Sequence, residues 1–192
     1  MTALEQLVEN THYSHSRNVA GISKIIAIKA GYSIQDASEI EQAALLHDIG
    51  KTSIPPGILN KKGKLSEEEY EVIKQHTAAG RGQIMEAVKM LTLAAVVAGE
   101  HHERLDGSGY CQKYGSEITR QVRLIAVCDV FDALVSKRSY KDPWDVSDAV
   151  TYLMENRGLF DQNIVQYLIA AISEIMAFYK NAQPALYMAH CR

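Results

Sequence analysis

The sequence HDIGK at positions 47–51 places an imidazole, a carboxylate and an amine within five residues, as His47, Asp48 and Lys51. An imidazole nitrogen and a carboxylate oxygen are ligands that a divalent first-row metal ion accepts. An apolar run at 43–46 precedes the pair, so we expect the pair at the end of a helix. A His-Asp pair there also fits a helix C-cap contact or a solvated polar pair, and the motif alone leaves these alternatives open.

Further potential ligands lie at the ends or on the apolar stripes of predicted helices: His15, His76, His101, His102 and Asp129. A single histidine on such a face is usually a core residue whose ring bonds a backbone carbonyl. Burying seven imidazoles and carboxylates together is different, because each uncompensated charge would cost several kcal/mol and buried charges are found paired or on metals. A helical bundle that directs all seven into one cavity around metal ions accounts for the whole set.

Helical spacing recurs along the chain, whereas strand-type alternation is hard to find. A first helix carries His15 on its apolar stripe and ends near Gly31. Ser33 and Ser66 each resemble the start of a capping box, and Thr119 is a further N-cap candidate. The helices they open are expected to run to residues 47–48, past His76 and past Asp129. Further helices are expected at about 89–102, 145–156 and 163–180.

Two segments between the helices are rich in glycine. Residues 50–64 contain Gly, Pro and Lys at a density that predicts a loop without helix. Residues 106–110 have two glycines within three positions, which predicts a turn with unusual backbone angles. The last predicted helix, 163–180, is apolar around much of its circumference, so it is either buried within the chain or the face of a homodimer.

The composition is that of an ordinary globular protein, with 47% hydrophobic and 22% charged residues and a net charge of −3. We expect one domain over 1–192, with a core at about 12–180 and a C-terminal tail at 181–192. Because no basic run is present, a surface for a nucleic acid polymer or a membrane is not expected. No signal peptide or spanning segment is evident, so a cytoplasmic location is expected. The three scattered cysteines favour neither a disulfide framework nor a thiolate zinc site.

Taken together, the motifs resemble the HD-GYP family, the cyclic-dinucleotide phosphodiesterase branch of the HD metal-dependent phosphohydrolases. The resemblance rests on HDIGK at 47–51, His76, HHERLDGSGY at 101–110 and CDVFDALVSKRSYK at 128–141. It runs from about residue 15 to 161, with the motifs in the family's order. It implies an all-α HD-domain helical bundle with a metal centre in its core.

The resemblance also implies which residues hold two divalent metal ions. One ion would be held by His15, His47, Asp48 and Asp129. Asp48 would bridge to a second ion, held by His76, His101 and His102. Iron or manganese is the family's usual metal, and nickel, cobalt or zinc also suits mixed His and carboxylate ligands. Two such ions about 3.5 to 4 Å apart can turn a bridging water into a hydroxide for in-line attack on phosphorus.

Further residues are implied to contact the substrate, a cyclic dinucleotide. Lys51 would lie against the scissile phosphate and, with the metals, offset the charge that builds in the transition state. Gly109 and Tyr110 would shape the floor under a guanine nucleotide, and Arg138 and Lys141 would reach its other phosphate or a base edge. Separately from these, Asp106 is a candidate acceptor for a ligand histidine N–H, with capping of its own turn as the alternative.

The sequence departs from the family pattern at two places. Cys111 replaces the proline of GYP, and the following loop, 112–118, is one residue shorter than usual. Losing the proline restores a backbone N–H and frees the chain, so we expect a less rigid substrate floor that Cys111→Pro would repair. Thr11 stands where some members have a glutamate for a third metal. Two metals and a linear dinucleotide product are therefore expected.

Three functions follow as hypotheses. The first is an active phosphodiesterase that opens cyclic di-GMP or a related cyclic dinucleotide to the linear form, with Asp48 and Lys51 in its catalytic centre. The second is a weak or inactive signalling module that binds the nucleotide or a protein. The third, a nucleotidase acting on mononucleotides, is disfavoured by the HHERLDGSGY motif and by residues 138–141.

Overall fold

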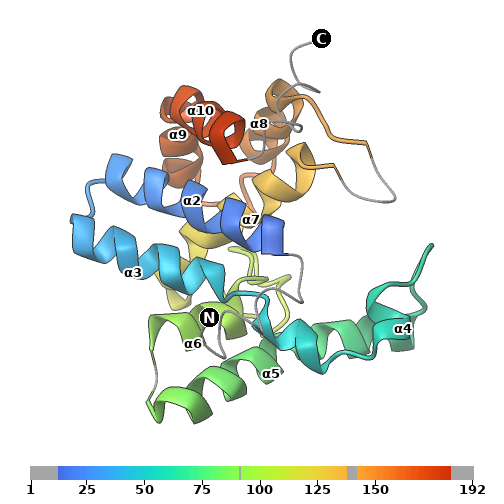
Figure 1. The fold of residues 1–192 in the computed structure, drawn as a ribbon. Helices are drawn as coiled ribbons and strands as arrows, with labels where there is room; N and C mark the ends of the chain where they lie inside the picture. The colour runs from blue at the N-terminus through green and yellow to red at the C-terminus, as the bar shows by residue number, and fades with distance from the viewer. Residues whose placement is uncertain (1–12, 91, 138–141, 183–192) are drawn as a thin grey trace.

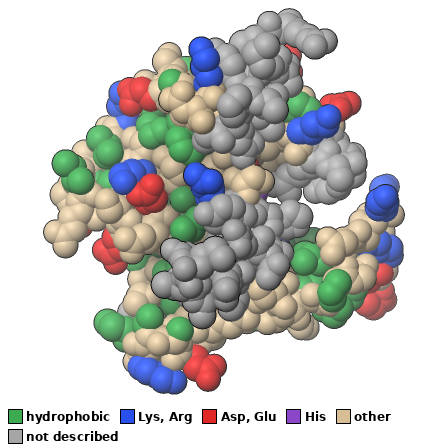
Figure 2. All heavy atoms as spheres, in the orientation of Figure 1, with side chains coloured by type: hydrophobic (Ala, Val, Ile, Leu, Met, Phe, Trp, Pro, Cys, Tyr) green, Lys and Arg blue, Asp and Glu red, His purple; other side chains and the backbone are tan. Residues whose placement is uncertain are grey.

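The computed structural model describes residues 13–90, 92–137 and 142–182. Within these ranges every regular element is helical and no strand occurs, which confirms the predicted all-α fold. None of the helices in these ranges is both long and apolar enough to cross a lipid bilayer. Figure 2 shows charged side chains of both signs scattered over one face, without a large patch of one sign among the coloured atoms.

The longer helices are α2 (Tyr13–Lys29), α3 (Ile34–Leu45), α5 (Glu67–Val88), α6 (Leu93–Glu100), α7 (Arg120–Val135), α8 (Val146–Glu155), α9 (Gln162–Ala170) and α10 (Ile172–Ala182). The short helical turns are η1 (Ile49–Ser53), α4 (Pro56–Leu59) and η2 (Gly115–Glu117). In Figure 1, α2 and α3 lie side by side, α5 and α6 lie below them, and α8 to α10 lie above. Helix α7 contacts α2, α6, α8 and α9. Most of its residues are buried, because it is surrounded on several sides.

The predicted helix starts are confirmed. The Ser33 hydroxyl accepts a hydrogen bond from the backbone N–H of Asp36 at 3.1 Å. Ser66 and Glu69 form a complete capping box at the start of α5. Thr119 accepts a hydrogen bond from Val122 N at the start of α7. Gly31 has a φ of +86°, the left-handed conformation that commonly ends a helix.

Several predicted element boundaries were wrong, among them the start of the helix expected at about 89–102, which begins at Leu93. The segment 50–64 was expected to be free of helix, but it contains the end of η1 and all of α4. The second helix was expected to reach residues 47–48, but α3 ends at Leu45. Since the chain tightens into η1 immediately afterwards, the His-Asp pair lies in the bend between the two helical elements.

The expected helix at 163–180 is broken into α9 and α10 at Ala171. The Ala171 N–H is shared between the carbonyls of Tyr167 and Leu168. This one-residue break keeps Leu168 and Ile175 fully buried on either side of it, and hydrophobic periodicity does not detect so short an interruption. Burial within the chain accounts for this apolar face, and a homodimer through the C-terminal helix stays a prediction.

Gly50 lets the HDIGK turn lie directly on the backbone of α5. A Cβ atom at this position would lie 1.9 Å from the His76 carbonyl oxygen and 2.4 Å from the Gly80 N atom. Such distances are far inside van der Waals contact, so a side chain here would force the two backbones apart. The absence of a side chain at Gly50 therefore lets the turn that carries Asp48 pack directly against the helix that carries His76.

We expect Gly50→Ala to lower the free energy of unfolding by about 2–3 kcal/mol, because the clash is with backbone that cannot rotate away. The matched control is Gly82→Ala in α5, where an added Cβ meets nothing within 4 Å. This control should raise stability by about 0.5–1 kcal/mol. Urea unfolding followed by circular dichroism measures both, and equal effects of the two variants would contradict the close packing.

Candidate metal centre

The structure brings all seven predicted ligands together, although they come from five parts of the chain. His15 is on α2, His76 on α5 and Asp129 on α7, while the His47-Asp48 and His101-His102 pairs follow α3 and α6. They form three overlapping clusters: His15, His47 and Asp129; His47, Asp48 and His101; and His76, His101 and His102. Within each cluster the potential ligand atoms lie within 4.8 Å of one another. Their roles as metal ligands stay predictions.

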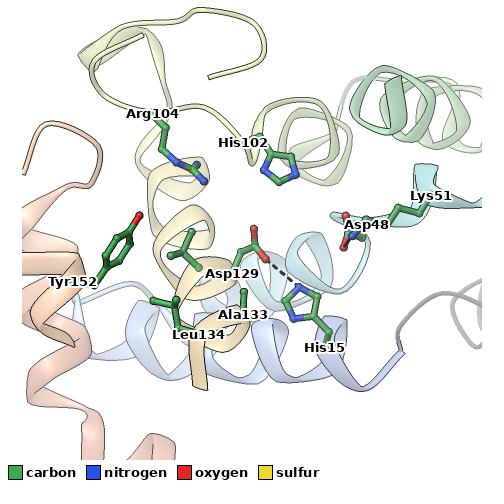
Figure 3. A pocket seen from close by; sticks show the side chains of 10 residues that line it. His15, Asp48, Lys51, His102, Arg104, Asp129, Ala133, Leu134 and Tyr152 are labelled. Carbon is green, nitrogen blue, oxygen red and sulfur yellow. Dashed lines mark hydrogen bonds and ion pairs between the residues drawn. The ribbon is translucent and has the colours of Figure 1, made fainter. Parts of the chain in front are cut away.

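The first cluster is centred on the carboxylate of Asp129. Its Oδ1 atom lies 3.0 Å from His15 Nε2 and 3.9 Å from His47 Nε2. Figure 3 shows Asp129 and His15 facing each other across one end of a cavity. These atoms are close enough to share one cation.

Asp48 connects this cluster to the second one. Its Oδ2 atom lies 3.2 Å from His47 Nε2, while Oδ1 lies 3.5 Å from His76 Nε2 and 3.6 Å from His101 Nε2. The His76 and His101 Nε2 atoms are 3.3 Å apart. The two oxygens of one carboxylate therefore face two different sets of imidazoles, as a bridging ligand would.

In three of the histidines Nδ1 contacts a backbone carbonyl, so Nε2 faces the other potential ligands. Nδ1 lies 2.7 Å from the Ala44 carbonyl in His47, 2.6 Å from the Ile73 carbonyl in His76 and 3.1 Å from the Val97 carbonyl in His101. A carbonyl oxygen only accepts, so Nδ1 carries the proton in each ring and the Nε2 lone pair points to the cluster. Such anchoring by an outer partner is typical of histidines that bind metals.

Unsatisfied atoms mark the middle of the clusters. Within the described part of the chain, buried His47 Nε2 and Asp48 Oδ1 have no hydrogen-bond partner. A buried acceptor without a partner costs about 1–3 kcal/mol. Both atoms lie among the other potential ligands, so a divalent cation would compensate each of them. The residues present therefore fit a metal site.

The protonation states also suit a metal. Burial, and then the nearby His101, lower the pKa of His76 to about 4 and that of His102 to about 2. Burial alone would raise the pKa of Asp48, but His47 and Lys51 hold it well below its usual range. Metal ligands must be neutral imidazoles or ionised carboxylates, and these three side chains already have those forms at neutral pH.

His15 differs from the other histidines. Burial opposes its charge, but hydrogen bonds to Asp129 and Asp132 outweigh burial and raise its pKa to about 9. The Asp132 Oδ2 atom lies 2.6 Å from His15 Nδ1. With this partner in place, binding of a cation at Nε2 would displace only the Nε2 proton.

The sequence patterns did not predict a role for Asp132. Its Oδ1 atom accepts hydrogen bonds from Asn18 Nδ2 at 2.8 Å, Ser136 Oγ at 2.9 Å and Tyr179 OH at 2.6 Å. The available signal was a second aspartate three residues after Asp129, in a stretch of α7 (124–135) whose other residues are all apolar. Asp132 fixes the ring of His15 and connects it to α10.

A cavity of about 260 Å³ opens beside the clusters. It is lined by members of the three clusters, by Lys51 and Arg104, and by further residues of α7 and α8: His15, Asp48, Lys51, His102, Arg104, Asp129, Val130, Ala133, Leu134 and Tyr152. Lys51 is part of this lining, and its Nζ atom lies 2.5 Å from Asp48 Oδ2, while its predicted contact with the scissile phosphate stays a prediction. Arg104, Leu134 and Tyr152 were not predicted, since only the folded chain brings them to this side (Figure 3).

Of the other predicted substrate-contacting residues, the structure describes Gly109 and Tyr110 but not Arg138 and Lys141. The Tyr110 ring packs on His102 with centroids 4.5 Å apart, and a Cβ on Gly109 would lie 2.5 Å from Glu103 Cα. Arg138 and Lys141 lie outside the described residues, as does Thr11. Asp106 accepts a hydrogen bond from Ser108 N at 2.9 Å, which is the turn-capping alternative.

The loop after Tyr110 is held by a buried carboxylate. Glu103 Oε1 accepts a hydrogen bond from Cys111 N at 2.7 Å, and Oε2 accepts one from Lys113 N at 2.8 Å. Glu103 is only 3% exposed. The N–H that a proline would lack is therefore in use, and the structure reverses the expectation that Cys111 loosens the loop.

Comparison with known proteins identifies the class. Residues 2–164 match the family model described as HD domain. The chain is 40% identical over 157 residues to the cyclic di-GMP phosphodiesterase response regulator RpfG of Xanthomonas campestris pv. campestris, covering 80% of this chain and 42% of RpfG. It is 37% identical over 168 residues to 3'3'-cGAMP-specific phosphodiesterase 2 of Vibrio cholerae, covering 85% of this chain and 32% of that protein.

A solved structure agrees with the fold. Bd1817, described as a HDG"Y"P protein from Bdellovibrio bacteriovorus, superposes with a TM-score of 0.69 at 20% identity, covering 83% of this chain and 51% of Bd1817. The chain therefore belongs to the HD domain family of metal-dependent proteins, and the predicted resemblance to its HD-GYP branch is confirmed. The chain spans less than half the length of these two curated relatives.

We expect Asp132→Asn to weaken metal binding about 10- to 100-fold, because partners that orient a ligand histidine contribute on this scale. Isothermal titration with Mn²⁺ measures the change. Tyr179→Phe is the matched control, since it removes one hydrogen bond to Asp132 without touching His15 and should change affinity much less. Unchanged affinity in the Asp132 variant would show that His15 needs no such partner.

We expect Cys111→Pro to destabilise the protein by about 1.5–3 kcal/mol, because it removes a hydrogen bond to a buried carboxylate. Cys111→Ala keeps the N–H and should stay within about 0.5 kcal/mol of the parent. Thermal unfolding of the two variants provides the comparison. A proline variant as stable as the alanine variant would show that the Glu103 contact contributes little.

Proposed function

We propose that this chain is a metal-dependent phosphodiesterase that hydrolyses a cyclic dinucleotide, cyclic di-GMP or a relative, to the linear dinucleotide. The observation that carries the proposal is the position of Asp48. It lies between two sets of imidazoles and beside Lys51, at the wall of a cavity. Curated relatives with cyclic dinucleotide phosphodiesterase names support the substrate class.

The proposed cofactor is a pair of divalent ions, iron or manganese. His15, His47, Asp48 and Asp129 would hold one, and His76, His101 and His102 would hold the other with Asp48. When bound, such ions supply an acidified water and charge stabilisation at phosphorus. The three overlapping clusters support two neighbouring positions better than one, because the outer clusters share no residue.

The chain's own residues would bind and orient the substrate. Lys51 is half-buried. Its ammonium group, near Asp48, can donate a hydrogen bond to a phosphoryl oxygen and offset its negative charge without leaving the cavity. Gly109 and Tyr110 would shape the floor, and Arg138 and Lys141 would contact the distal phosphate or a base. Thr11 in place of a third metal ligand favours release of the linear dinucleotide.

The binding-module hypothesis has less support than the enzyme. It depended on a loosened loop at Cys111, whereas the Glu103 carboxylate holds that loop through two backbone N–H groups. A site that only binds nucleotide also has no need for a carboxylate shared between two imidazole clusters.

We expect Asp48→Ala to lose bound metal and hydrolysis together, since this carboxylate contacts imidazoles from both outer clusters. Lys51→Ala should keep its metal and lower kcat about 10²- to 10³-fold, the usual loss for one transition-state donor. Lys62→Ala, an exposed lysine, is the control and should match the parent. Metal content by mass spectrometry and chromatography of products from cyclic di-GMP with Mn²⁺ or Fe²⁺ give the readouts.

Hydrolysis that survives in the Asp48 variant would reject the two-metal mechanism. Metal-loaded parent protein that yields no product from cyclic di-GMP, 3'3'-cGAMP or cyclic di-AMP would favour the binding module. A mononucleotide product would contradict the role given to Thr11.

A further inference from the structure

The cavity has two chemically different ends. Asp48, Lys51 and His15 lie at one end, and Arg104 and Tyr152 lie at the other, as Figure 3 shows. His102 and Asp129 lie between the two ends in Figure 3, and α7 adds apolar side chains to the lining, which are Val130, Ala133 and Leu134. A charged end beside a metal-type centre suits a phosphate, whereas an apolar wall with an aromatic ring and one cation suits a nucleobase.

Arg104 is held in place by backbone groups. Its NH1 donates to the Glu103 carbonyl at 2.8 Å and to the His101 carbonyl at 3.3 Å. Its Cζ lies 5.4 Å from the centroid of the Phe160 ring, a cation–π distance. These contacts fix the plane of the guanidinium before any ligand binds.

No carboxylate of the described residues forms an ion pair with Arg104, although the hydrogen bonds from Ser108 and, less so, the charge of Arg104 lower the pKa of the exposed Asp106. Both hydrogen bonds of Arg104 use NH1, so the N–H groups of Nε and NH2 are available to a ligand. Two parallel N–H groups of this kind bind two neighbouring acceptors at once. Arg104 therefore lines the cavity with a guanidinium that is held in place and has N–H donors without a hydrogen-bond partner among the described residues.

The ring of Tyr152, at the same end of the cavity as Arg104, is also held in place by packing. The Tyr152 ring packs against Trp144 with centroids 5.9 Å apart and against Phe160 with centroids 6.2 Å apart. Phe160 thus contacts both Arg104 and Tyr152. The three side chains form one assembly, and a flat ligand between Tyr152 and Leu134 would meet prepositioned groups.

The size of the cavity limits what can enter it. At about 260 Å³ it is smaller than the roughly 300–1,000 Å³ of pockets that enclose drug-sized ligands. The cavity is partly open to solvent, so one base with its adjoining phosphate would be enclosed while the rest of a cyclic dinucleotide extends out of it. The end near Lys51 takes the phosphate, so the end near Arg104 takes the base.

We propose that Arg104, with Tyr152 and Leu134, forms a nucleobase subsite that selects guanine over adenine beside the phosphate under attack. This inference rests on the proposed function. Guanine presents two acceptors, O6 and N7, which an arginine fork binds together. Adenine presents N7 beside an amino donor, which repels one arm of the fork. Arg104 thereby sets base preference in an enzyme whose relatives differ in their substrates.

The test compares cyclic di-GMP with cyclic di-AMP as substrates of the Mn²⁺-loaded protein. Glutamine pairs with adenine N6 and N7, so Arg104→Gln should lower the ratio of kcat/KM for the guanine over the adenine substrate by about 10- to 100-fold. Metal content should stay unchanged. Arg157→Gln makes the same chemical change at an exposed arginine outside the cavity lining and should leave the ratio as it is.

Equal losses for both substrates in Arg104→Gln would overturn the subsite, because a contact to phosphate or a role in positioning His102 affects both alike. A parent protein that prefers cyclic di-AMP would overturn it as well. In either case the proposed function stands. If the parent neither hydrolyses nor binds either dinucleotide in titration calorimetry, the proposed function fails together with the subsite.

Discussion

The structure depends on keeping the carboxylate of Asp48 ionised in the interior. Asp48 is 3% exposed, and an isolated buried carboxylate would cost several kcal/mol. His47 and Lys51 on one side and His76 and His101 on the other surround it, yet Oδ1 still lacks a hydrogen bond among the described residues. Compensation by side chains is therefore incomplete, and this incompleteness is the physical reason to place a cation there.

Several elements of the fold serve this arrangement. The end of α3 presents His47 and Asp48 in a bend, and Gly50 lets that bend lie against α5. Helix α7 delivers Asp129 from the centre of the bundle, and Asp132 one turn later holds the ring of His15. The rigid packing of these backbones preorganises the ligands, because none of them has to move far to meet its neighbours.

Sequence patterns predicted the features of the structure that depend on residues close together in the chain. The capping boxes and the histidines on apolar stripes depend on neighbours three or four residues away, so spacing was sufficient. The break at Ala171 and the helical turns in 49–59 depend on tertiary packing, which periodicity does not record. Asp132 and Arg104 were missed for a related reason: each acts on a residue or a cavity wall that only folding brings near. Residues 138–141 carry a predicted substrate contact that the described structure does not reach.

The segment HHER at 101–104 connects the predicted metal ligands to the proposed base subsite. His101 and His102 face the clusters, the Glu103 carboxylate holds the loop after Tyr110, and Arg104 faces the cavity. Arg104 also bonds the carbonyls of His101 and Glu103, so its guanidinium and the metal ligands share one rigid backbone turn. A change in the loop at Cys111 would reach Glu103 first and, through this turn, both the ligand rings and the arginine. The Cys111 N–H, which a proline would lack, donates to this same Glu103 carboxylate.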